Sequence, residues 1–261
     1  MITFCSDFGT ADPYAAIVKG VVLSINPKAR IIDLSHELTP HDVRRAAFFV
    51  ASVCSAFPPG TIHLCVVDPG VGSARKPILL VTEKGLFIGP DNGLFGLLWR
   101  NSKRKQAYWL KDEKYFFTGS SRTFDARDIF GPVATYLSLG VAPEEFGPAL
   151  SKINLLEFPA PVRRIFSEGG KRRFTGEIIY IDRFGNLVTN FPYPLVRGKR
   201  MEVKVKNRVM RGPASNYAMI PKGKVSPVLG SLGYLEIAGY AQSAQKLLKA
   251  EVGAKTELTL V

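Results

Sequence analysis

The chain has 261 residues, and 46% of them are hydrophobic, so it can build one large domain or two ordinary ones, and a disordered chain is excluded. No apolar run reaches the roughly 20 residues that a membrane-spanning helix needs, so we expect no membrane partner. A net charge of +13 raises nucleic acid as a partner. The basic residues, however, collect at 163–173 and 197–211, and the second stretch alternates with apolar residues as a half-buried strand does, so we do not expect nucleic acid to bind.

The cysteines and histidines form no pattern that would hold a metal. Cys5, Cys54 and Cys65 each lie in an apolar segment, which favours buried reduced thiols. The histidines have unrelated spacings, so we expect no metal site. The first residues include Asp7 and lack the basic and apolar regions of a signal peptide, so we expect a cytoplasmic protein.

Strands and helices alternate through the first half of the chain. In chain order the hydrophobic pattern predicts a strand at 1–5, a helix at 14–26, a strand at 29–35, a helix at 41–57, a strand at 61–67, a hairpin at 77–83 and 85–90, and a helix at 125–140. Such alternation predicts an α/β fold with a mostly parallel sheet and helices on both faces.

The second half has the pattern of a smaller β domain. Proline, glycine and basic residues are concentrated at 158–175, so we predict an N-terminal domain at 1–160, a linker at 161–174 and a C-terminal domain at 175–261. The elements predicted beyond the linker are strands at 175–182, 187–191, 201–206, 234–239 and 255–261 and a helix at 241–251. Short strands in this number predict a small β-barrel.

Carboxylates follow three of the predicted strands. Asp7 ends the first strand, Asp33 lies in the end of the second and Asp68 ends the third, and ligands of open α/β sheets bind beyond these carboxyl ends. The Asp7 carboxylate could accept two hydrogen bonds from a sugar diol, although an Asx-turn explains it equally well. Asp68 precedes a turn rich in glycine, and Arg75 follows seven residues later. The local pattern leaves open whether this arginine returns to the carboxylate.

Three further polar stretches have a local explanation. Asp12 precedes a proline, which is the pairing expected at a helix N-cap. The stretch 89–96 contains the Asp-Asn-Gly sequence of a tight turn. A turn is also the simplest interpretation of 182–190, but there Phe184 could stack on a purine while the Asn186 amide reads the base edge.

The sequence contains neither the GxGxxG nor the GxxxxGK[ST] fingerprint of nucleotide sites, and no GxSxG hydrolase elbow. Six segments taken together instead resemble one family, the S-adenosyl-L-methionine (SAM) hydrolases, also called SAM hydroxide adenosyltransferases, which are relatives of the SAM-dependent fluorinase and chlorinase. They span nearly the whole chain in order and read SDFGTADPY, DPGVGSAR, GPDNGL, TFDARDIFGPVA, IDRFGNLVTN and GSLGYLEIAGYAQSA.

The resemblance implies a fold, an assembly and a binding site. The fold would be an N-terminal α/β domain with a C-terminal β-barrel. The protein would be a homotrimer that binds SAM between the N-terminal domain of one subunit and the C-terminal domain of the next. Asp7 would hold the ribose hydroxyls, and Asp12 is a further substrate-binding candidate. The neighbouring subunit would hold adenine and the methionine end through Asp182, Phe184, Asn186, Ser231 and Glu236.

The resemblance also implies a reaction. In the hydrolase branch an aspartate and an arginine activate a water, and Asp68 and Arg75 match these positions, whereas the halogenases carry tyrosine at the first. Asp68 would also contact the substrate. SAM is itself the substrate, and its sulfonium leaves as neutral methionine, so we expect no general acid and no cofactor. Arg75 would fix the Asp68 carboxylate and keep it ionised.

One position departs from the family pattern. The segment that typically reads Thr-Phe-His-Gly-Arg-Asp has Asp125 in place of the histidine. Asp125 could hold the water instead, its presence could mean weakened or altered chemistry, and it could also cap a helix at 126–139. We therefore expect hydrolysis of SAM to adenosine and methionine with Asp68, Arg75 and Asp125 as catalytic residues. The alternatives are a SAM or adenosine binder without this activity, and halide addition to SAM, which a carboxylate at the site would oppose.

Overall fold

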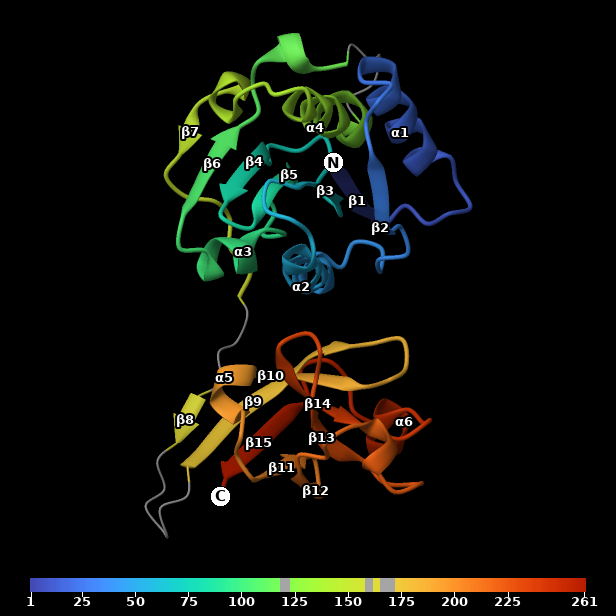
Figure 1. The fold of residues 1–261 in the computed structure, drawn as a ribbon, viewed down its shortest axis with the longest axis vertical. Helices are drawn as coiled ribbons and strands as arrows, with labels where there is room; N and C mark the ends of the chain where they lie inside the picture. Colours follow the sequence, from blue (N-terminus) through green and yellow to red (C-terminus); the bar gives the residue numbers. More distant parts are fainter. Residues whose placement is uncertain (118–122, 158–161, 165–171) are drawn as a thin grey trace. The chain divides into compact units, whose positions relative to one another are not determined.

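The computed structural model describes residues 1–117, 123–157, 162–164 and 172–261. The chain forms two compact units, unit 1 (Met1–Glu157) and unit 2 (Phe158–Val261), and each is described by itself (Figure 1). The predicted linker, 161–174, contains strand residues at both ends, because β8 (Val162–Arg164) pairs antiparallel with β9 (Arg172–Ile181). The proline- and glycine-rich composition of the linker therefore did not exclude strand pairing within it, and its residues 161 and 165–171 lie outside the described residues.

Unit 1 begins with the alternation that its sequence predicts. Its elements are β1 (Ile2–Ser6), α1 (Tyr14–Ile25), β2 (Ile31–Ser35), α2 (Val43–Val53), β3 (Ile62–Val66), β4 (Pro77–Thr82), β5 (Gly85–Pro90), α3 (Gly96–Asn101), β6 (Lys105–Trp109), a π-helical turn (Ala126–Phe130), α4 (Gly131–Ser138) and β7 (Ala149–Leu150). Short 3-10 turns lie at Cys54–Ala56, Glu113–Tyr115 and Pro143–Phe146. The sequence pattern missed α3, β6 and β7, which are short.

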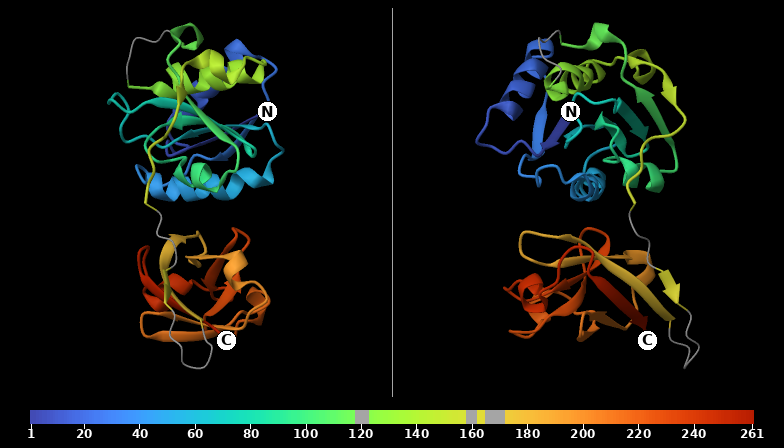
Figure 2. Two further views of the ribbon diagram at one scale, coloured as in Figure 1. Left: turned by 90° about the vertical axis from the view of Figure 1, so that its left-hand side faces the viewer. Right: turned by 180° about the vertical axis from the view of Figure 1, so that it is seen from behind.

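The seven strands form one mixed sheet in the order β2-β1-β3-β5-β4-β6-β7. The strands β2, β1, β3 and β5 are parallel, and β4, β6 and β7 add antiparallel pairs. Helices α1 and α4 cover one face of the sheet, and α2 and α3 lie on the other (Figure 2). The central strands β1 and β3 are buried on both faces, as the 0–1% exposure of the consecutive residues Phe4 and Cys5, and Leu64 and Cys65, shows. The prediction of an α/β domain with a mostly parallel sheet is confirmed.

Two helix starts differ from the prediction. Pro13 occupies the N-cap position of α1 without a side-chain hydrogen bond, so the interpretation of Asp12 as a cap is wrong. Asp125 precedes the π-helical turn but makes no capping hydrogen bond either. By contrast, Asp42 caps α2 by accepting a hydrogen bond from the Arg45 amide at 2.9 Å. A carboxylate before a helix therefore caps it only where the backbone turn aims the carboxylate at the free amides.

Unit 2 is an antiparallel, nearly closed barrel. Beyond β8 and β9 its elements are β10 (Leu187–Pro192), α5 (Tyr193–Val196), β11 (Met201–Val205), β12 (Arg208–Gly212), a 3-10 turn (Tyr217–Met219), β13 (Ser226–Leu229), β14 (Tyr234–Ala238), α6 (Ala244–Leu248) and β15 (Lys255–Leu260). The strand order is β12-β11-β15-β9-β10-β14-β13. The two end strands approach each other where the Ala214 amide donates to the Pro227 carbonyl at 2.9 Å. The predicted C-terminal β-barrel is confirmed.

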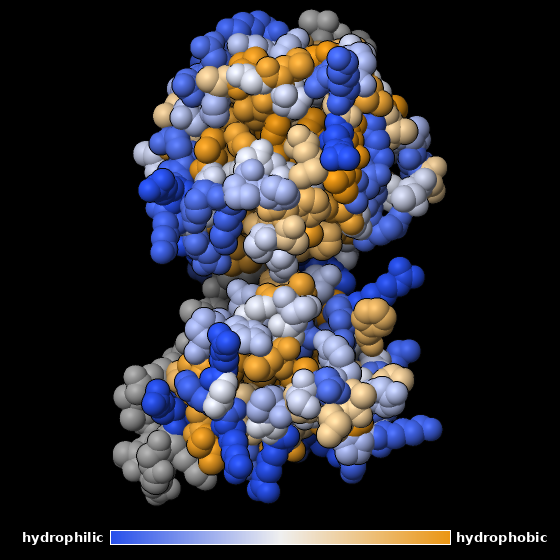
Figure 3. All heavy atoms as spheres, in the orientation of Figure 1, coloured by the Kyte–Doolittle hydropathy of each residue, from blue (hydrophilic) through white to orange (hydrophobic). Residues whose placement is uncertain are grey.

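The basic stretch at 197–211 forms the β11–β12 hairpin. Along β11 the apolar side chains of Met201, Val203 and Val205 are buried, whereas Lys204 between them is exposed. Hydrophilic side chains project from this region of unit 2 in Figure 3. The alternation therefore describes a half-buried strand, as predicted. Among the described residues no helix combines the length and the hydrophobicity that crossing a bilayer requires.

His63 is a titratable group enclosed in the core of unit 1. Its side chain lies on β3 and is 1% exposed. Its Nδ1 atom is 2.7 Å from the Thr3 hydroxyl, and its ring stacks on Phe87 with the centroids 4.7 Å apart. Burial lowers the pKa of His63 from 6.5 to about 4, because the enclosed imidazolium loses its hydration. The folded protein therefore holds this side chain neutral.

This burial predicts a loss of stability on mild acidification. Between the unfolded pKa of about 6.5 and the folded pKa of about 4, the unfolded chain binds more protons, so stability falls as the pH falls. Between about pH 7 and pH 4, we expect the free energy of unfolding of the wild type to fall by up to about 3 kcal/mol more than that of His63→Phe. Urea unfolding of both proteins over this range measures the difference. An identical pH dependence would contradict a neutral His63 in the fold.

Candidate active site

The polar residues that end β1 and β3 lie at one edge of the unit 1 sheet. The two strands are parallel neighbours, with Ser6 paired to Val66, so Asp7 and Asp68 follow adjacent strands. Strand β1 lies between β2 and β3 in the sheet. The chain passes from β1 through α1 to β2 on one side of β1, and then through α2 to β3 on its other side. This is the point of an open α/β sheet at which the strand order reverses and a crevice opens for a ligand.

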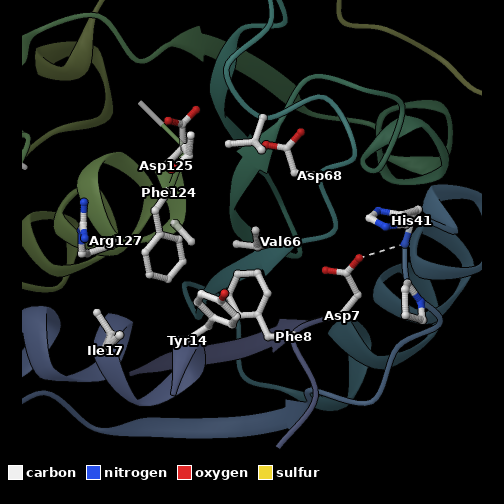
Figure 4. A pocket seen from close by; sticks show the side chains of 14 residues that line it. Asp7, Phe8, Tyr14, Ile17, His41, Val66, Asp68, Phe124, Asp125 and Arg127 are labelled. Carbon is white, nitrogen blue, oxygen red and sulfur yellow. Dashed lines mark hydrogen bonds between the residues drawn. The ribbon is translucent and has the colours of Figure 1, made fainter. Parts of the chain in front are cut away.

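A cavity of about 740 Å³ lies at this edge (Figure 4). Its lining includes Asp7, Asp68 and Asp125, three of the residues that the sequence nominated. The remaining lining residues are Phe8, Tyr14, Ile17, Pro40, His41, Val66, Val71, Thr123, Phe124, Ala126 and Arg127. Asp12 is exposed and is not among them.

Arg75 returns to Asp68 and also reaches Asp125. Its Nε atom donates to Asp68 Oδ1 at 3.0 Å, and its Nη2 atom donates both to Asp68 Oδ2 and to Asp125 Oδ2. The three side chains are largely buried, at 9% exposed for Arg75, 6% for Asp68 and 16% for Asp125. The guanidinium also lies 5.6 Å from the ring centroid of Phe130, which closes one side of it. We call these three residues the carboxylate–guanidinium triad.

Burial has the largest effect on the pKa of Asp68. Desolvation raises the pKa of Asp68 above its usual value of 3.8, and the hydrogen bonds and charge of Arg75 offset this only in part. The negative charge of Asp125 adds to the increase. Burial by itself would lower the pKa of Arg75, but the hydrogen bonds and charges of both carboxylates outweigh burial and raise it above its usual value. An ionised Asp68 is therefore a stronger base than an exposed aspartate.

The turn at 89–96 holds both ends of the loop between Asp68 and Arg75. Asn92 Nδ2 donates to the Val67 carbonyl at 2.9 Å, immediately before Asp68. The Asp91 amide donates to the Lys76 carbonyl at 2.8 Å, immediately after Arg75. The sequence predicted the turn correctly but gave no sign of this bracing, which depends on β3, β4 and β5 lying side by side.

Asp7 is fixed from a loop that the sequence did not connect to it. Its Oδ2 atom accepts a hydrogen bond from the His41 amide at 2.9 Å, and Figure 4 shows the second oxygen turned towards the cavity. His41 has a φ of 63°, a left-handed conformation that is uncommon outside glycine. The Asx-turn interpretation of Asp7 is therefore not needed. The backbone of His41 leaves one carboxylate oxygen of Asp7 for a ligand.

The other candidates at these strand ends have structural roles. His36 is buried, and its Nδ1 atom lies 2.7 Å from the Ser6 hydroxyl, which joins the ends of β1 and β2. Asp33 pairs with Lys19 at 2.5 Å. Neither lines the cavity. The sequence analysis did not nominate Phe8 and Tyr14, although both line the cavity. The one signal for them was the presence of aromatic residues just before and at the start of a helix.

Unit 2 contains a second cavity, of about 850 Å³. Its lining includes all five residues that the sequence nominated in this half of the chain, namely Asp182, Phe184, Asn186, Ser231 and Glu236. The other lining residues are Tyr217, Leu232, Gly239, Tyr240, Ala241, Gln242 and Ser243. The positions come from the β9–β10 turn, from β14 and from the loops beside them, which the barrel brings together.

Hydrogen bonds order the polar groups of this second cavity. The Asp182 carboxylate accepts from the Phe184 amide at 2.9 Å and from the Asn186 side-chain amide at 2.9 Å. The Asx-type turn that results leaves the Phe184 ring 79% exposed. One amide hydrogen of Asn186 is thereby used, and its carbonyl oxygen and second hydrogen remain for a ligand.

Glu236 is the buried carboxylate of the second cavity. It is 3% exposed, and it accepts a hydrogen bond from the Tyr217 hydroxyl at 3.0 Å. Burial raises the pKa of Glu236, and burial together with the Glu236 charge raises the pKa of Tyr217 to about 12. A Cβ atom on Gly230 would lie 2.0 Å from Glu236 Oε1, so only glycine leaves room for this carboxylate.

The described residues of the two cavities are not arranged as a metal centre. Within residues 1–117, 123–157, 162–164 and 172–261, no group of three or more His, Cys, Asp or Glu side chains is arranged to hold an ion. The three cysteines are free and buried. The polar groups of unit 1 are suited to orienting a small neutral molecule, and those of unit 2 to binding an aromatic base and polar ligand groups.

Known proteins resemble the chain over nearly its whole length. Residues 2–147 match the SAM hydroxide adenosyltransferase N-terminal domain, and residues 176–257 match the C-terminal domain. The chain is 34% identical to a protein of Thermus thermophilus named (R)-S-adenosyl-L-methionine hydrolase, over 98% of either chain. A more distant relative, named fluorinase, from an Actinoplanes species is 29% identical over 73% of this chain and 71% of its own length.

A solved structure has the same fold. It is an uncharacterized conserved protein from Thermotoga maritima, which superposes with a TM-score of 0.90 at 32% identity and covers 99% of each chain. The predicted family is thus confirmed by the domain matches, by the relatives and by the fold. The chain belongs to the SAM hydroxide adenosyltransferase family.

Proposed function

We propose that the protein is an enzyme that hydrolyses SAM to adenosine and L-methionine. The observation that carries this proposal is the return of Arg75 to Asp68 at the wall of the unit 1 cavity. A buried, ionised carboxylate that faces a cavity can orient a water molecule there. Full-length relatives named (R)-S-adenosyl-L-methionine hydrolase support the same reaction.

The chemistry that this requires is simple. Water attacks the ribose C5′ atom, the C5′–S bond breaks, and both of its electrons go to sulfur, so methionine leaves as a neutral thioether. The oxygen of the water becomes the 5′-hydroxyl of adenosine, and one proton is released. Asp68 orients the water and accepts this proton, and Arg75 holds Asp68 in place. We propose that no cofactor takes part, because the sulfonium of the substrate is already a good leaving group.

The charge of the unit 1 cavity favours water over a halide as the nucleophile. Asp68 and Asp125 share a single guanidinium, so the triad carries a net negative charge when both are ionised. Asp7 adds a further carboxylate to the lining. A halide ion entering this cavity would be repelled, whereas a neutral water is accepted and a cationic substrate is attracted. We therefore favour hydrolysis over halide addition to SAM.

Asp125 takes the position of the family histidine and contacts Arg75, which joins it to Asp68. Because Arg75 Nη2 lies between the carboxylates, their mutual repulsion is offset and a water can be held by both. This arrangement supports retained hydrolysis over a protein that only binds SAM or adenosine. We therefore propose that Asp125 belongs to the water site, which agrees with its lack of a capping hydrogen bond.

We further propose that the complete site forms between copies of the chain in a homotrimer in the cytoplasm. Asp7 and the triad belong to unit 1, and the residues suited to the adenine and methionine ends belong to unit 2. Phe184, which is 79% exposed, would be covered by adenine and by the neighbouring subunit. The buried, reduced cysteines suit a reducing compartment.

Incubation with SAM tests the reaction directly. We expect adenosine and methionine in equal amounts, resolved by chromatography, and no change in the products when chloride is added. Formation of 5′-chloro-5′-deoxyadenosine would assign the protein to the halide-transferring branch. Bound SAM that is recovered intact would show that the protein is a binder.

The charge of Asp125 predicts a shift in the pH profile. Activity requires ionised Asp68, whose pKa is raised, so kcat should fall on acidification with a midpoint above the usual 3.8. The charge of Asp125 contributes to this increase, so Asp125→Asn should move the midpoint to lower pH. Asp68→Asn should lower kcat about 100-fold or more at every pH. Asp112→Asn serves as a control, because the half-buried Asp112 lies outside the lining of the cavity. An unchanged midpoint in Asp125→Asn would show that the charge of Asp125 does not affect the pKa of Asp68.

Mixing two inactive variants tests the proposed assembly. Asp68→Asn disables the unit 1 cavity and Asn186→Ala disables the unit 2 cavity, so each variant alone should be inactive. If a site uses one unit from each of two copies, mixed oligomers contain some sites with both cavities intact, and activity should return. Light scattering should show a trimer for each protein. A mixture that stays inactive after subunit exchange would place the whole site within one chain.

A further inference from the structure

Three aromatic side chains form a continuous surface in the unit 1 cavity. Phe8, Tyr14 and Phe124 all line it, and each ring contacts the other two, with centroids 5.5–5.8 Å apart. Tyr14 is 47% exposed although it belongs to this cluster. We call these residues the aromatic wall. The proposed hydrolysis step assigns no role to them.

The position of the aromatic wall relative to the triad is informative. In Figure 4 the carboxylates of Asp68 and Asp125 lie on one side of the cavity, and the rings of Phe8 and Tyr14 lie on the other. Phe124 extends from beside Asp125 towards those rings. The two carboxylates of the triad therefore face the rings of Phe8 and Tyr14 across the cavity, and the carboxylate of Asp7 lies beside Phe8.

Displacement at carbon constrains how a substrate fits between the triad and the aromatic wall. The attacking oxygen, C5′ and the departing sulfur must lie nearly in line. If the water is held at the triad, the sulfur lies beyond C5′, on the side away from Asp68 and Asp125. That side is the aromatic wall. The faces of aromatic rings attract cations, including methylated cations that no hydrogen bond can hold.

We infer that Phe8, Tyr14 and Phe124 bind the methylsulfonium of the substrate and select it over a neutral thioether. The inference rests on the proposed hydrolysis of SAM, because it uses the direction of attack. The guanidinium of Arg127 already lies 5.4 Å from the Phe124 ring centroid, and its charge is balanced by Asp128 at 2.6 Å. A cation against this cluster is thus part of the fold itself. The sulfonium becomes neutral as the C5′–S bond breaks, so the same wall holds the methionine product less tightly.

Two unreactive ligands separate charge from shape. S-adenosylhomocysteine has a neutral thioether at the sulfur position, and sinefungin has a protonated amine on carbon there, and the enzyme can hydrolyse neither by this route. We expect the wild type to bind sinefungin more tightly than S-adenosylhomocysteine, as measured by calorimetry. Tyr14→Leu and Phe8→Leu should reduce that preference by roughly 2- to 30-fold, the range of one cation–π contact. Tyr14→Phe should keep it.

Ile17→Val provides the matched control, because Ile17 lines the same cavity without a ring. It should change both affinities by the same factor. An equal loss for both ligands in Tyr14→Leu and Phe8→Leu, or no loss for either, would overturn the inference and leave the rings with a packing role. The exposed Tyr14 tolerates substitution, and melting temperatures check that all variants are folded. A wild type that binds both ligands but releases no adenosine from SAM would disprove the proposed hydrolysis, while the ratio of affinities would still decide the role of the wall.

Discussion

The sharing of one guanidinium by two carboxylates is the interaction on which the unit 1 site depends. A buried carboxylate without a partner is costly, and Asp68 and Asp125 are both largely buried. Arg75 offsets this cost only if the loop after β3 turns back on itself. The Ser73 hydroxyl accepts a hydrogen bond from the Arg75 amide, and Asp91 and Asn92 donate to the backbone at the two ends of the loop. Because a buried ion pair is weak evidence for stability, the triad is better understood as a functional arrangement that the surrounding loop maintains.

The π-helical turn before α4 explains how Asp125 enters this arrangement. A π-turn fits one extra residue into the first helical turn and rotates the side chains that precede it. Asp125 lies directly before this turn, makes no cap hydrogen bond and instead contacts Arg75. Insertions of this kind are frequent at functional sites, where the redirection of a side chain outweighs the weaker helix geometry.

The two cavities use buried carboxylates in different ways. In unit 1 the excess negative charge faces open space, where it can attract a cation and orient a water. In unit 2, Glu236 is deeply buried and accepts a hydrogen bond from Tyr217. The Asp182 carboxylate accepts hydrogen bonds within the turn that exposes Phe184. The first arrangement is suited to chemistry and the second to recognition. Charge, aromatic surface and turn geometry therefore divide the proposed function between the units.

The amino-acid sequence was enough to predict the fold class, the family and the main polar residues of both cavities, although most of the other lining residues were not predicted. Hydrophobic periodicity is local, so it predicted β1 to β5, α1, α2 and the barrel strands β9, β10, β11, β14 and β15, but it missed β8, β12 and β13. The order of six motifs identified the family. The tertiary structure decided which of these residues meet. Strand order is a long-range property, so only the fold brings Asp7 and Asp68 into one cavity and leaves Asp12 outside it. The fold also connects His41 to Asp7 and Asn92 to the loop after Asp68. For the same reason the contact of Asp125 could not be predicted. A local pattern cannot distinguish a carboxylate that caps a helix from one that contacts an arginine fifty residues earlier in the chain.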